Sequence, residues 1–484
     1  MEDVQLLIGD RDVGAKNSAT FVRANPISGE VASRAAAATV EDARAAADAA
    51  AKAFPKWSAL GPSARRGLLN KAADLLEQRA AQFATLMMAE TGATNGWGHF
   101  NVHLAAGMLR EAASMTTQIQ GEVVPSDVPG AVAMAIRQPV GVVLGIAPWN
   151  APVILGVRAI AMPLACGNTV ILKASEVCPG THRLIGTVLK EAGLGEGVVN
   201  VITHDAKDAG AIVDVLAAHP SVRRINFTGS TRVGKLIAQT AARYLKPVLL
   251  ELGGKAPLIV LDDADIDAAV NAAVFGAFAN SGQICMSTER IIVHEKVADE
   301  FAQKLAKRVA ALPCGDPRQG EFVLGSVVGR PTVDRVEKLV AAAVAQGAKV
   351  LAGGEKCTNT VMKGVVVDYV TPQMALFREE SFGPQVSITR VKSADEAIEL
   401  ANDTEYGLSA ALFTRDIAKG IELAKRIESG ICHINSPTVQ DEAQMPFGGV
   451  KSSGYGRFGG RAGVAEFTDL RWITVQTGAR HYPF

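Results

Sequence analysis

The sequence predicts an α/β protein that is built on a parallel β-sheet and divided into more than one domain. From residue 141 onward, short apolar runs alternate with helical segments, as in right-handed βαβ units. At 484 residues the chain is longer than a single hydrophobic core normally supports. Hydrophobic residues make up 48% and charged residues 20%, which allows large cores and gives no sign of disorder.

Helices are expected to precede this region. Residues 31–118 are rich in Ala, Leu, Arg and Glu and show helical periodicity. Within them, residues 61–90 predict two long amphipathic helices, because alanine and leucine are strong helix formers and recur at helical spacing.

The strands of the sheet are predicted from six apolar runs. They span residues 141–148, 168–173, 198–203, 223–228, 247–254 and 257–261. Segments 181–193 and 230–244 read as helices between them. Ligands of parallel sheets bind beyond the carboxyl ends of the strands, so the residues just after each run are the first place to look for a site.

A further helix is predicted after Asp263, with Asp265 as its N-cap and Asn280–Gly282 as its stop. Cys285 therefore falls on a loop just past a helix. Strand–helix alternation from 289 to about 440 predicts a second α/β domain, and residues 471–477 an edge strand. The most membrane-like stretch, 153–172, contains Arg158, Pro163 and Asn168, so a buried helix followed by a buried strand explains it better.

Charge and cysteine usage narrow the class of protein. Lys+Arg and Asp+Glu both total 49, a balance that argues against a nucleic-acid partner. The N-terminus shows no secretory signal pattern, and no membrane partner is expected. The six cysteines form no CxxC pair and are sparse for a disulfide framework, which favours reduced thiols in a cytoplasmic protein.

Three stretches at predicted strand ends or loops carry reactive groups: 148–150, 251–255 and 283–285. Together they hold what aldehyde oxidation needs. The thiol of Cys285 can attack a carbonyl carbon once a base activates it. The side-chain amide of Asn150 and the backbone N–H of Cys285 can stabilise the oxyanion. Glu251 can activate water to hydrolyse the thioester that remains.

Seven motifs make the chain resemble the aldehyde dehydrogenase superfamily over essentially its whole length. They are PWN at 148–150, KASE at 173–176, FTGSTRVG at 227–234, ELGGK at 251–255, QIC at 283–285, EESFGP at 379–384 and PFGGVKSSG at 446–454. Each is weak evidence alone, but their order and spacing are highly specific. The resemblance implies a Rossmann-like parallel-sheet NAD domain, a second α/β catalytic domain and a small β oligomerisation arm.

The resemblance also implies domain bounds. Residues 1–118 and 140–253 would form the NAD-binding domain and residues 254–455 the catalytic domain. Residues 119–139 and 469–484 would form the arm, with a strand near 131–140. An arm of this kind implies a homodimer or a homotetramer.

The family's roles carry over to matching positions. Cys285 matches the nucleophile, Glu251 the general base and Asn150 the oxyanion donor. Expected cofactor contacts are Ile146, Pro148, Trp149, Lys173, Glu176, Phe227, Gly229, Ser230, Val233, Leu252, Gly253, Glu380 and Phe382. Ala174 departs from the family's KPSE but leaves Lys173 and Glu176 intact. A carboxylate at Glu176 suits a ribose 2′-hydroxyl and repels a 2′-phosphate, so we expect NAD as cofactor and weaker use of NADP.

Within the superfamily the chain resembles the bacterial dehydrogenases of aromatic aldehydes such as salicylaldehyde, benzaldehyde and vanillin. Segments 97–122, 223–234, 283–290 and 434–449 carry this likeness. Arg158 lies about two helical turns beyond Asn150, so both can face one funnel, where a guanidinium can meet ring substituents or stack on the ring. Trp97 is a candidate for another wall. Structural alternatives stay open for both residues.

Other functions remain as alternatives. They are an aldehyde dehydrogenase for aliphatic aldehydes, an acylating member that uses coenzyme A, and a non-catalytic homologue with a binding or structural role. The intact Glu251 argues against the acylating reading, and the presence of both Cys285 and Glu251 against the non-catalytic one. No metal site is expected, because His99 and His103 have helical spacing but lack the glutamate of an HExxH motif.

Overall fold

The structure is a computed structural model that describes residues 1–355 and 359–484, so Cys357 lies outside the described residues. Its largest sheet has eight strands in the order β20-β12-β11-β8-β9-β10-β2-β3. The parallel centre consists of β8 (Val142–Ile146), β9 (Thr169–Lys173), β10 (Val199–Ile202), β11 (Val222–Thr228) and β12 (Val248–Glu251). The antiparallel edges are β2 (Leu6–Ile8), β3 (Arg11–Val13) and β20 (Gly454–Tyr455). The predicted parallel sheet is confirmed.

Helices cover both faces of this sheet, because alternate residues of each strand face opposite cores. On one face Val142, Leu144 and Ile146 pack against α1 (Val40–Ser58), α7 (Ala209–Ala218) and α8 (Thr231–Arg243). On the other face Val143 packs against α5 (Pro152–Ala165) and α6 (Pro179–Ala192). Helices α2 (Pro62–Gln78), α3 (Ala80–Thr91) and α4 (Asn95–Met115) add an outer layer here. We call this sheet and its helices the first lobe.

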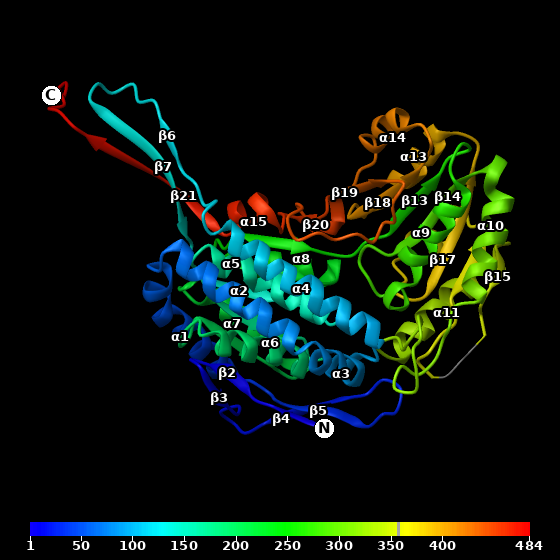
Figure 1. Ribbon diagram of the computed structural model, residues 1–484, viewed down its shortest axis with the longest axis horizontal. Coiled ribbons are helices and arrows are strands. Elements are labelled where there is room, and N and C mark those ends of the chain that lie inside the picture. Colours follow the sequence, from blue (N-terminus) through cyan, green and yellow to red (C-terminus); the bar gives the residue numbers. More distant parts are fainter. Residues whose placement is uncertain (356–358) are drawn as a thin grey trace.

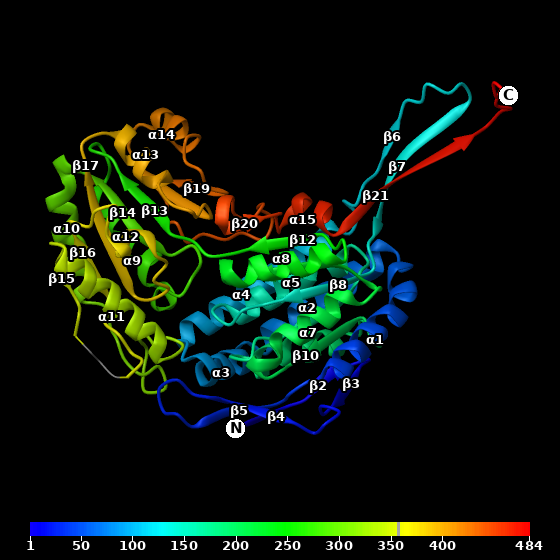
Figure 2. The same ribbon diagram turned by 180° about the vertical axis from the view of Figure 1, so that it is seen from behind.

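The prediction of helical structure from residue 31 was wrong at its start. Residues Val31–Ala36 form strand β5, which pairs with β1 (Glu2–Val4) and β4 (Thr20–Ala24) in a separate three-stranded sheet. Alanine-rich composition does not prevent a strand where tertiary pairing is available. In Figures 1 and 2 this sheet runs beneath the helices of the first lobe toward the other half of the molecule, where Arg23 donates to the carbonyl of Val328 at 3.0 Å.

A second lobe is built on a seven-stranded sheet, in the order β15-β16-β17-β14-β13-β18-β19. Its strands are β13 (Ala256–Val260), β14 (Thr288–His294), β15 (Lys349–Ala352), β16 (Val365–Asp368), β17 (Gln385–Val391), β18 (Ser409–Phe413) and β19 (Ile431–Ile434). Helices α9 (Ile266–Phe278) and α10 (Glu295–Ala310) pack on one face, and α13 (Ala394–Asn402) and α14 (Ile417–Ala424) on the other. Helices α11 (Arg330–Ala345) and α12 (Ala375–Arg378) cover its β16 end. The sixth apolar run of the sequence, β13, thus belongs to this sheet and not to the first.

A β-arm projects from the first lobe (Figure 1). It consists of β6 (Glu122–Val124), β7 (Ala131–Pro139) and the C-terminal β21 (Thr468–Gln476), which pairs with β7 along its whole length. The predicted C-terminal edge strand is confirmed, because β21 lies at the edge of this sheet. The short helix α15 (Gly460–Glu466) precedes β21.

The segment 153–172 forms buried α5 and β9, as predicted, and no helix within residues 1–355 and 359–484 is long and apolar enough to cross a bilayer.

Candidate active site

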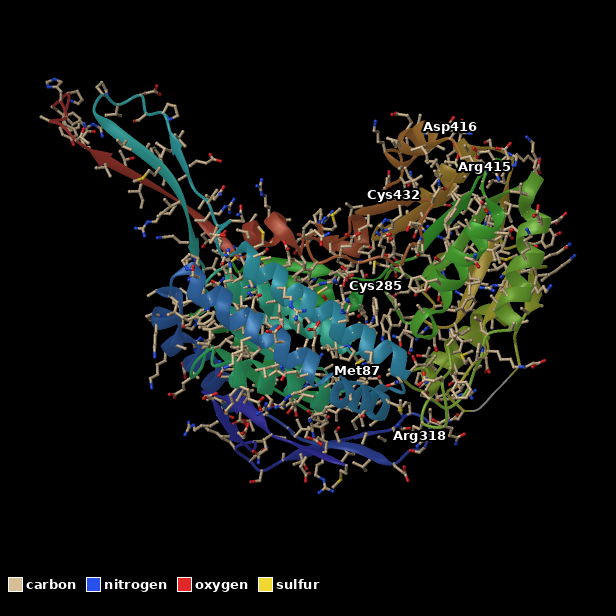
Figure 3. All side chains as sticks on the ribbon, in the orientation of Figure 1. Met87, Cys285, Arg318, Arg415, Asp416 and Cys432 are labelled. Carbon is tan, nitrogen blue, oxygen red and sulfur yellow. The ribbon has the colours of Figure 1, made fainter. Side chains whose placement is uncertain are left out.

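Cys285 lies on the loop between α9 and β14, at the junction of the two lobes (Figure 3). Asp265 caps the start of α9 by accepting from the N–H of Ala268, as the sequence predicted. Past the end of α9, Asn280, Ser281 and Gly282 have φ values of 48°, 53° and 72°. This left-handed run turns the chain back and delivers Cys285 into the space between the lobes.

Two glycines allow the loops around Cys285 to approach closely. A Cβ on Gly254 would lie 2.2 Å from the carbonyl oxygen of Cys285, so the loop after β12 can pass this near only as glycine. A Cβ on Gly282 would lie 2.2 Å from the carbonyl oxygen of Gly383. The motifs at 251–255, 283–285 and 379–384 are thus packed directly on one another.

Asn150 is held beside the cysteine loop by a small network. Its side-chain Nδ2 donates to the carbonyl of Gln283 at 2.9 Å, which uses one of the two amide hydrogens. Its own carbonyl accepts from Asn280 Nδ2 at 2.9 Å and from the indole N–H of Trp97 at 3.0 Å. Among the described residues the second amide hydrogen of Asn150 has no acceptor, so it can donate to a ligand.

Glu251 is the last residue of β12 and is fully buried. Within the described residues neither of its carboxylate oxygens has a partner at full hydrogen-bond geometry, although the Cys285 thiol and the Thr228 hydroxyl are near enough to lower its pKa. Burial raises the pKa of Glu251 to about 7, and the nearby positive charge of Arg158 opposes the shift. A carboxyl with a pKa near neutrality can both accept and release a proton at neutral pH.

The surroundings of the Cys285 thiol disfavour its thiolate form. Burial raises its pKa well above the ordinary value, and the neighbouring Glu251 carboxylate raises it further. A nucleophilic thiolate therefore requires transfer of this proton to a base. Glu251 is the candidate for that base, because it lines the same cavity as Cys285 and each of the two groups shifts the pKa of the other.

Cys285, Glu251 and Asn150 line one cavity of about 410 Å³ between the lobes. Eight of the predicted cofactor residues line the same cavity: Pro148, Trp149, Gly229, Ser230, Leu252, Gly253, Glu380 and Phe382. The structure thus brings together eleven of the residues singled out in the sequence, three for the chemistry and eight for the cofactor. Ile146, Lys173, Glu176, Phe227 and Val233 are not among its lining residues.

Those five lie along the adjoining edge of the sheet. Ile146, Lys173 and Phe227 are in register at the carboxyl ends of β8, β9 and β11. From β8 the chain adds β9 and β10 on one side and then β11 and β12 on the other, so the direction of strand addition reverses between β8 and β11. Doubly wound sheets bind nucleotides at such a switch point. Lys173 is buried, and burial lowers its pKa. Glu176 follows on the next loop, half-buried, and its charge acts on Lys173 without an ion pair between them in the described structure.

The N-terminus of α8 opens at the same edge. Ser230 is its N-cap and accepts from the N–H of Val233 at 3.4 Å. The turn before it includes Gly229, where a Cβ would lie 2.4 Å from the ring of Phe227. The first N–H groups of a helix and its dipole favour an anion, so this terminus suits a phosphate group.

Trp149 and Phe382 face each other across the cavity as an edge-to-face pair with ring centroids 5.8 Å apart. Phe382 has a φ of 49°, a strained value that the surrounding loop enforces. Next to it, Glu380 accepts from the N–H of Gly254 at 2.9 Å. Burial raises the pKa of Glu380 to about 7, and the charge of Glu289 adds to the shift.

The two residues predicted to meet the substrate have other partners here. Arg158, on α5, is buried, forms an ion pair with Asp441 and stacks over the ring of Phe447 at 4.1 Å. Trp97 stacks on Phe100, with ring centroids 5.3 Å apart, and is not among the residues that line the large cavity. Its hydrogen bond to the carbonyl of Asn150 helps to hold Asn150 in place.

Sequence reasoning missed several residues that hold the site together. Glu289 accepts from the N–H groups of Ser381 and Phe382, both at 3.0 Å, and pairs with the buried ammonium of Lys255. Arg335 lines the cavity and donates to the carbonyl of Ser381 at 2.8 Å. Asp441, the partner of Arg158, was also missed. Glu289 and Asp441 lie inside segments 283–290 and 434–449, which carry the family likeness. The neighbouring sequence does not show which residues they contact.

A partly buried cysteine, a buried carboxylate and a side-chain amide thus meet beside a nucleotide-type sheet edge, an arrangement typical of a cysteine-dependent oxidoreductase. The aldehyde dehydrogenase family matches residues 13–473, and the chain belongs to that family. The chain is therefore an NAD(P)-dependent aldehyde dehydrogenase, as the sequence predicted.

Full-length relatives carry related names. The chain is 61% identical to a vanillin dehydrogenase of a Pseudomonas species (strain HR199), with all of both chains covered. It is 49% identical to a salicylaldehyde dehydrogenase of Pseudomonas putida over 99% of each chain. The crystal structure of a salicylaldehyde dehydrogenase from Pseudomonas putida G7, complexed with salicylaldehyde, superposes with a TM-score of 0.98 at 48% identity and covers both chains completely.

Proposed function

We propose that this protein oxidises an aromatic aldehyde to the carboxylic acid, with NAD as hydride acceptor and Cys285 as covalent nucleophile. The observation that carries the proposal is the meeting of Cys285, Glu251 and Asn150 in one cavity with eight residues expected to hold the cofactor. The names of the full-length relatives support aromatic aldehydes as the substrate class.

The reaction begins with activation of the thiol. Glu251 accepts the proton of Cys285, and the thiolate sulfur attacks the aldehyde carbon to form a C–S bond. The carbonyl oxygen becomes an oxyanion. The second amide hydrogen of Asn150 and the backbone N–H of Cys285 stabilise it by donating hydrogen bonds. The product of this step is a thiohemiacetal on Cys285.

The residues around the rest of the cavity fit a dinucleotide. The α8 terminus at Ser230 suits the pyrophosphate, and Glu380 and the Trp149–Phe382 pair suit the nicotinamide side. The bound nicotinamide supplies the acceptor for the hydride that leaves the thiohemiacetal carbon, so that carbon becomes a thioester carbonyl.

Hydrolysis completes the reaction. Glu251, once its first proton has passed to solvent, removes a proton from water, and the water oxygen attacks the thioester carbon. The C–S bond breaks, the acid leaves and Cys285 is regenerated. A base so placed favours water over coenzyme A as acyl acceptor, which supports a non-acylating enzyme.

Among the two nicotinamide cofactors we propose NAD. Glu176 lies close enough to Lys173 at the edge of the sheet to act on its pKa, and its carboxylate favours a ribose hydroxyl over a 2′-phosphate. Lys173 supplies a balancing positive charge, which is consistent with weaker use of NADP.

The first experiment is NADH formation at 340 nm by purified protein with NAD, across benzaldehyde, salicylaldehyde, vanillin and hexanal. Strong turnover of the aromatic aldehydes, lost in Cys285→Ala, is the expected result. Preference for hexanal would keep the mechanism and overturn the substrate class. Turnover that survives Cys285→Ala would overturn the mechanism, and no turnover of any aldehyde would favour a non-catalytic role.

The remaining proposals concern assembly, lobes and compartment. We propose that the β-arm joins subunits into a homodimer or homotetramer, because its exposed apolar side chains include Val123, Leu470 and Trp472, the last 77% exposed. We assign NAD binding to residues 1–118 and 140–253, catalysis to 254–455 and assembly to 119–139 and 469–484.

We also propose a cytoplasmic location. The free thiols of Cys166, Cys178, Cys285 and Cys432 support it, because disulfides are rare in that compartment.

A further inference from the structure

The ion pair between Arg158 and Asp441 lines a second, much smaller cavity. Its space is about 30 Å³, and apart from Glu111 and Glu442 its other walls are mainly apolar, with Met108, Met162 and Phe447 among them. A space of this size holds one water-sized group and not an aromatic ring. It is a niche for a substituent.

Burying two charged groups here costs free energy that their mutual attraction only partly offsets. The side chain of Arg158 is only 6% exposed and that of Asp441 only 11%. Replacing a buried pair of this kind by apolar residues is often neutral or stabilising for folding. Its presence one helical turn along α5 from Leu155, which lines the cavity of Cys285, points to recognition of a polar group.

The pair leaves one acceptor unfilled. Asp441 Oδ2 accepts from Arg158 Nη2, whereas Asp441 Oδ1 is buried and has no hydrogen-bond partner among the described residues. An unsatisfied buried carboxylate oxygen costs free energy that an incoming O–H donor recovers. A ring hydroxyl is a donor that fits the niche.

The niche lies on the reactive side of the molecule. The charge of Arg158 lowers the pKa of both Glu251 and Cys285, and that of Asp441 raises the pKa of Glu251. Along α5, Arg158 stands one helical turn beyond Leu155, which lines the cavity of Cys285, so the niche and that cavity are neighbours on one face of this helix. An aldehyde held at Cys285 with its ring directed along α5 would present position 4 of the ring to the pair.

We propose that Asp441 is a specificity-determining residue whose free Oδ1 accepts the hydrogen bond of a hydroxyl at position 4 of a hydroxybenzaldehyde, while its Oδ2 fixes Arg158 over Phe447. This inference rests on the proposed function. It adds the substrate feature that is recognised and the residue that recognises it.

The test compares kcat/KM for 4-hydroxybenzaldehyde with that for 4-methoxybenzaldehyde, which lacks the donor. The wild type should favour the hydroxyl by at least about 10-fold, since sites built to bond a hydroxyl reject analogues that lack it. In Arg158→Met/Asp441→Leu, an apolar pair of similar volume, the ratio should fall to near 1. In Asp441→Asn, which keeps a neutral acceptor and the shape, it should fall part of the way.

A matched control removes an exposed pair of the same residue types, Arg426→Met/Asp395→Leu, and should keep the wild-type ratio. Thermal melts establish that each variant is folded, and 2-hydroxybenzaldehyde serves as the position control because its hydroxyl lies next to the aldehyde. A ratio unchanged in both site variants overturns the inference, as does a greater loss on 2-hydroxybenzaldehyde than on 4-hydroxybenzaldehyde. If the wild type oxidises no aromatic aldehyde, that result contradicts the proposed function instead.

Discussion

The two sides of Cys285 are built in different ways. On the cofactor side, the cavity is formed by short loops at strand ends, where glycines such as Gly229 and Gly254 let backbones approach and a helix N-terminus points inward. On the other side, the niche is formed by side chains from α4, α5 and the loop before Phe447. A site made of backbone suits a ligand shared by a whole family, whereas a site made of side chains can change with the substrate.

In the proposed mechanism Glu251 acts as base in two steps, so its replacement should have the largest effect. Glu251→Gln should lower kcat by about 10²–10⁴-fold, because both activation of the thiol and hydrolysis of the thioester lose their base. A loss below tenfold in steady-state kcat with benzaldehyde would show that another group acts as the base.

The pH profile sharpens this test. Since the base must be ionised and burial raises the pKa of Glu251 to about 7, kcat/KM of the wild type should rise with pH and level off above about 7. The rise of kcat/KM with pH should disappear in Glu251→Gln. A rise that persists unchanged in the variant would assign the titration to a different group.

Asn150 should come next. Asn150→Ala removes one oxyanion donor and should lower kcat by about 10²–10³-fold, with little change in the binding of NAD. The variant also breaks the hydrogen bond to Gln283, so Asn150→Asp, which keeps the shape but loses the amide donor, is the matched control. Full activity of Asn150→Asp would remove the amide from the mechanism.

Glu176 tests the cofactor side alone. The wild type should have a higher kcat/KM for NAD than for NADP, and Glu176→Gln should reduce that preference by about tenfold, because a like-charge repulsion of the 2′-phosphate is lost. Aldehyde preference, measured with saturating NAD, should not move. Equal kcat/KM for the two cofactors in the wild type would contradict the assignment.

Trp97 should give the smallest effect. Trp97→Phe keeps an aromatic ring on Phe100 but removes the indole donor to the Asn150 carbonyl, a net contribution of about 1 kcal/mol. As a positioning residue it should lower kcat severalfold for benzaldehyde and hexanal alike. A change in KM confined to aromatic aldehydes would instead make Trp97 a wall of the substrate pocket.

The sequence by itself determined the alternation of strands and helices from residue 141, the cap of α9 and the loop that carries Cys285. These features are local: periodicity, capping and left-handed turns act over a few residues. It also identified the family, because its motifs are contiguous segments. The prediction of helical structure was wrong at residues 31–36, where pairing with β1 and β4 overrode the helical composition.

Tertiary structure decided the rest. The pKa of Glu251 depends on burial by both lobes, the loop at 379–384 depends on Glu289 and Lys255, and the niche depends on Arg158 meeting Asp441 across 283 positions of sequence. No local pattern encodes such contacts, because a charged residue has the same propensities whether it ends at the surface or against a buried partner. Whether such a residue is exposed or buried against a partner depends on the fold, which brings distant segments together and excludes water from them.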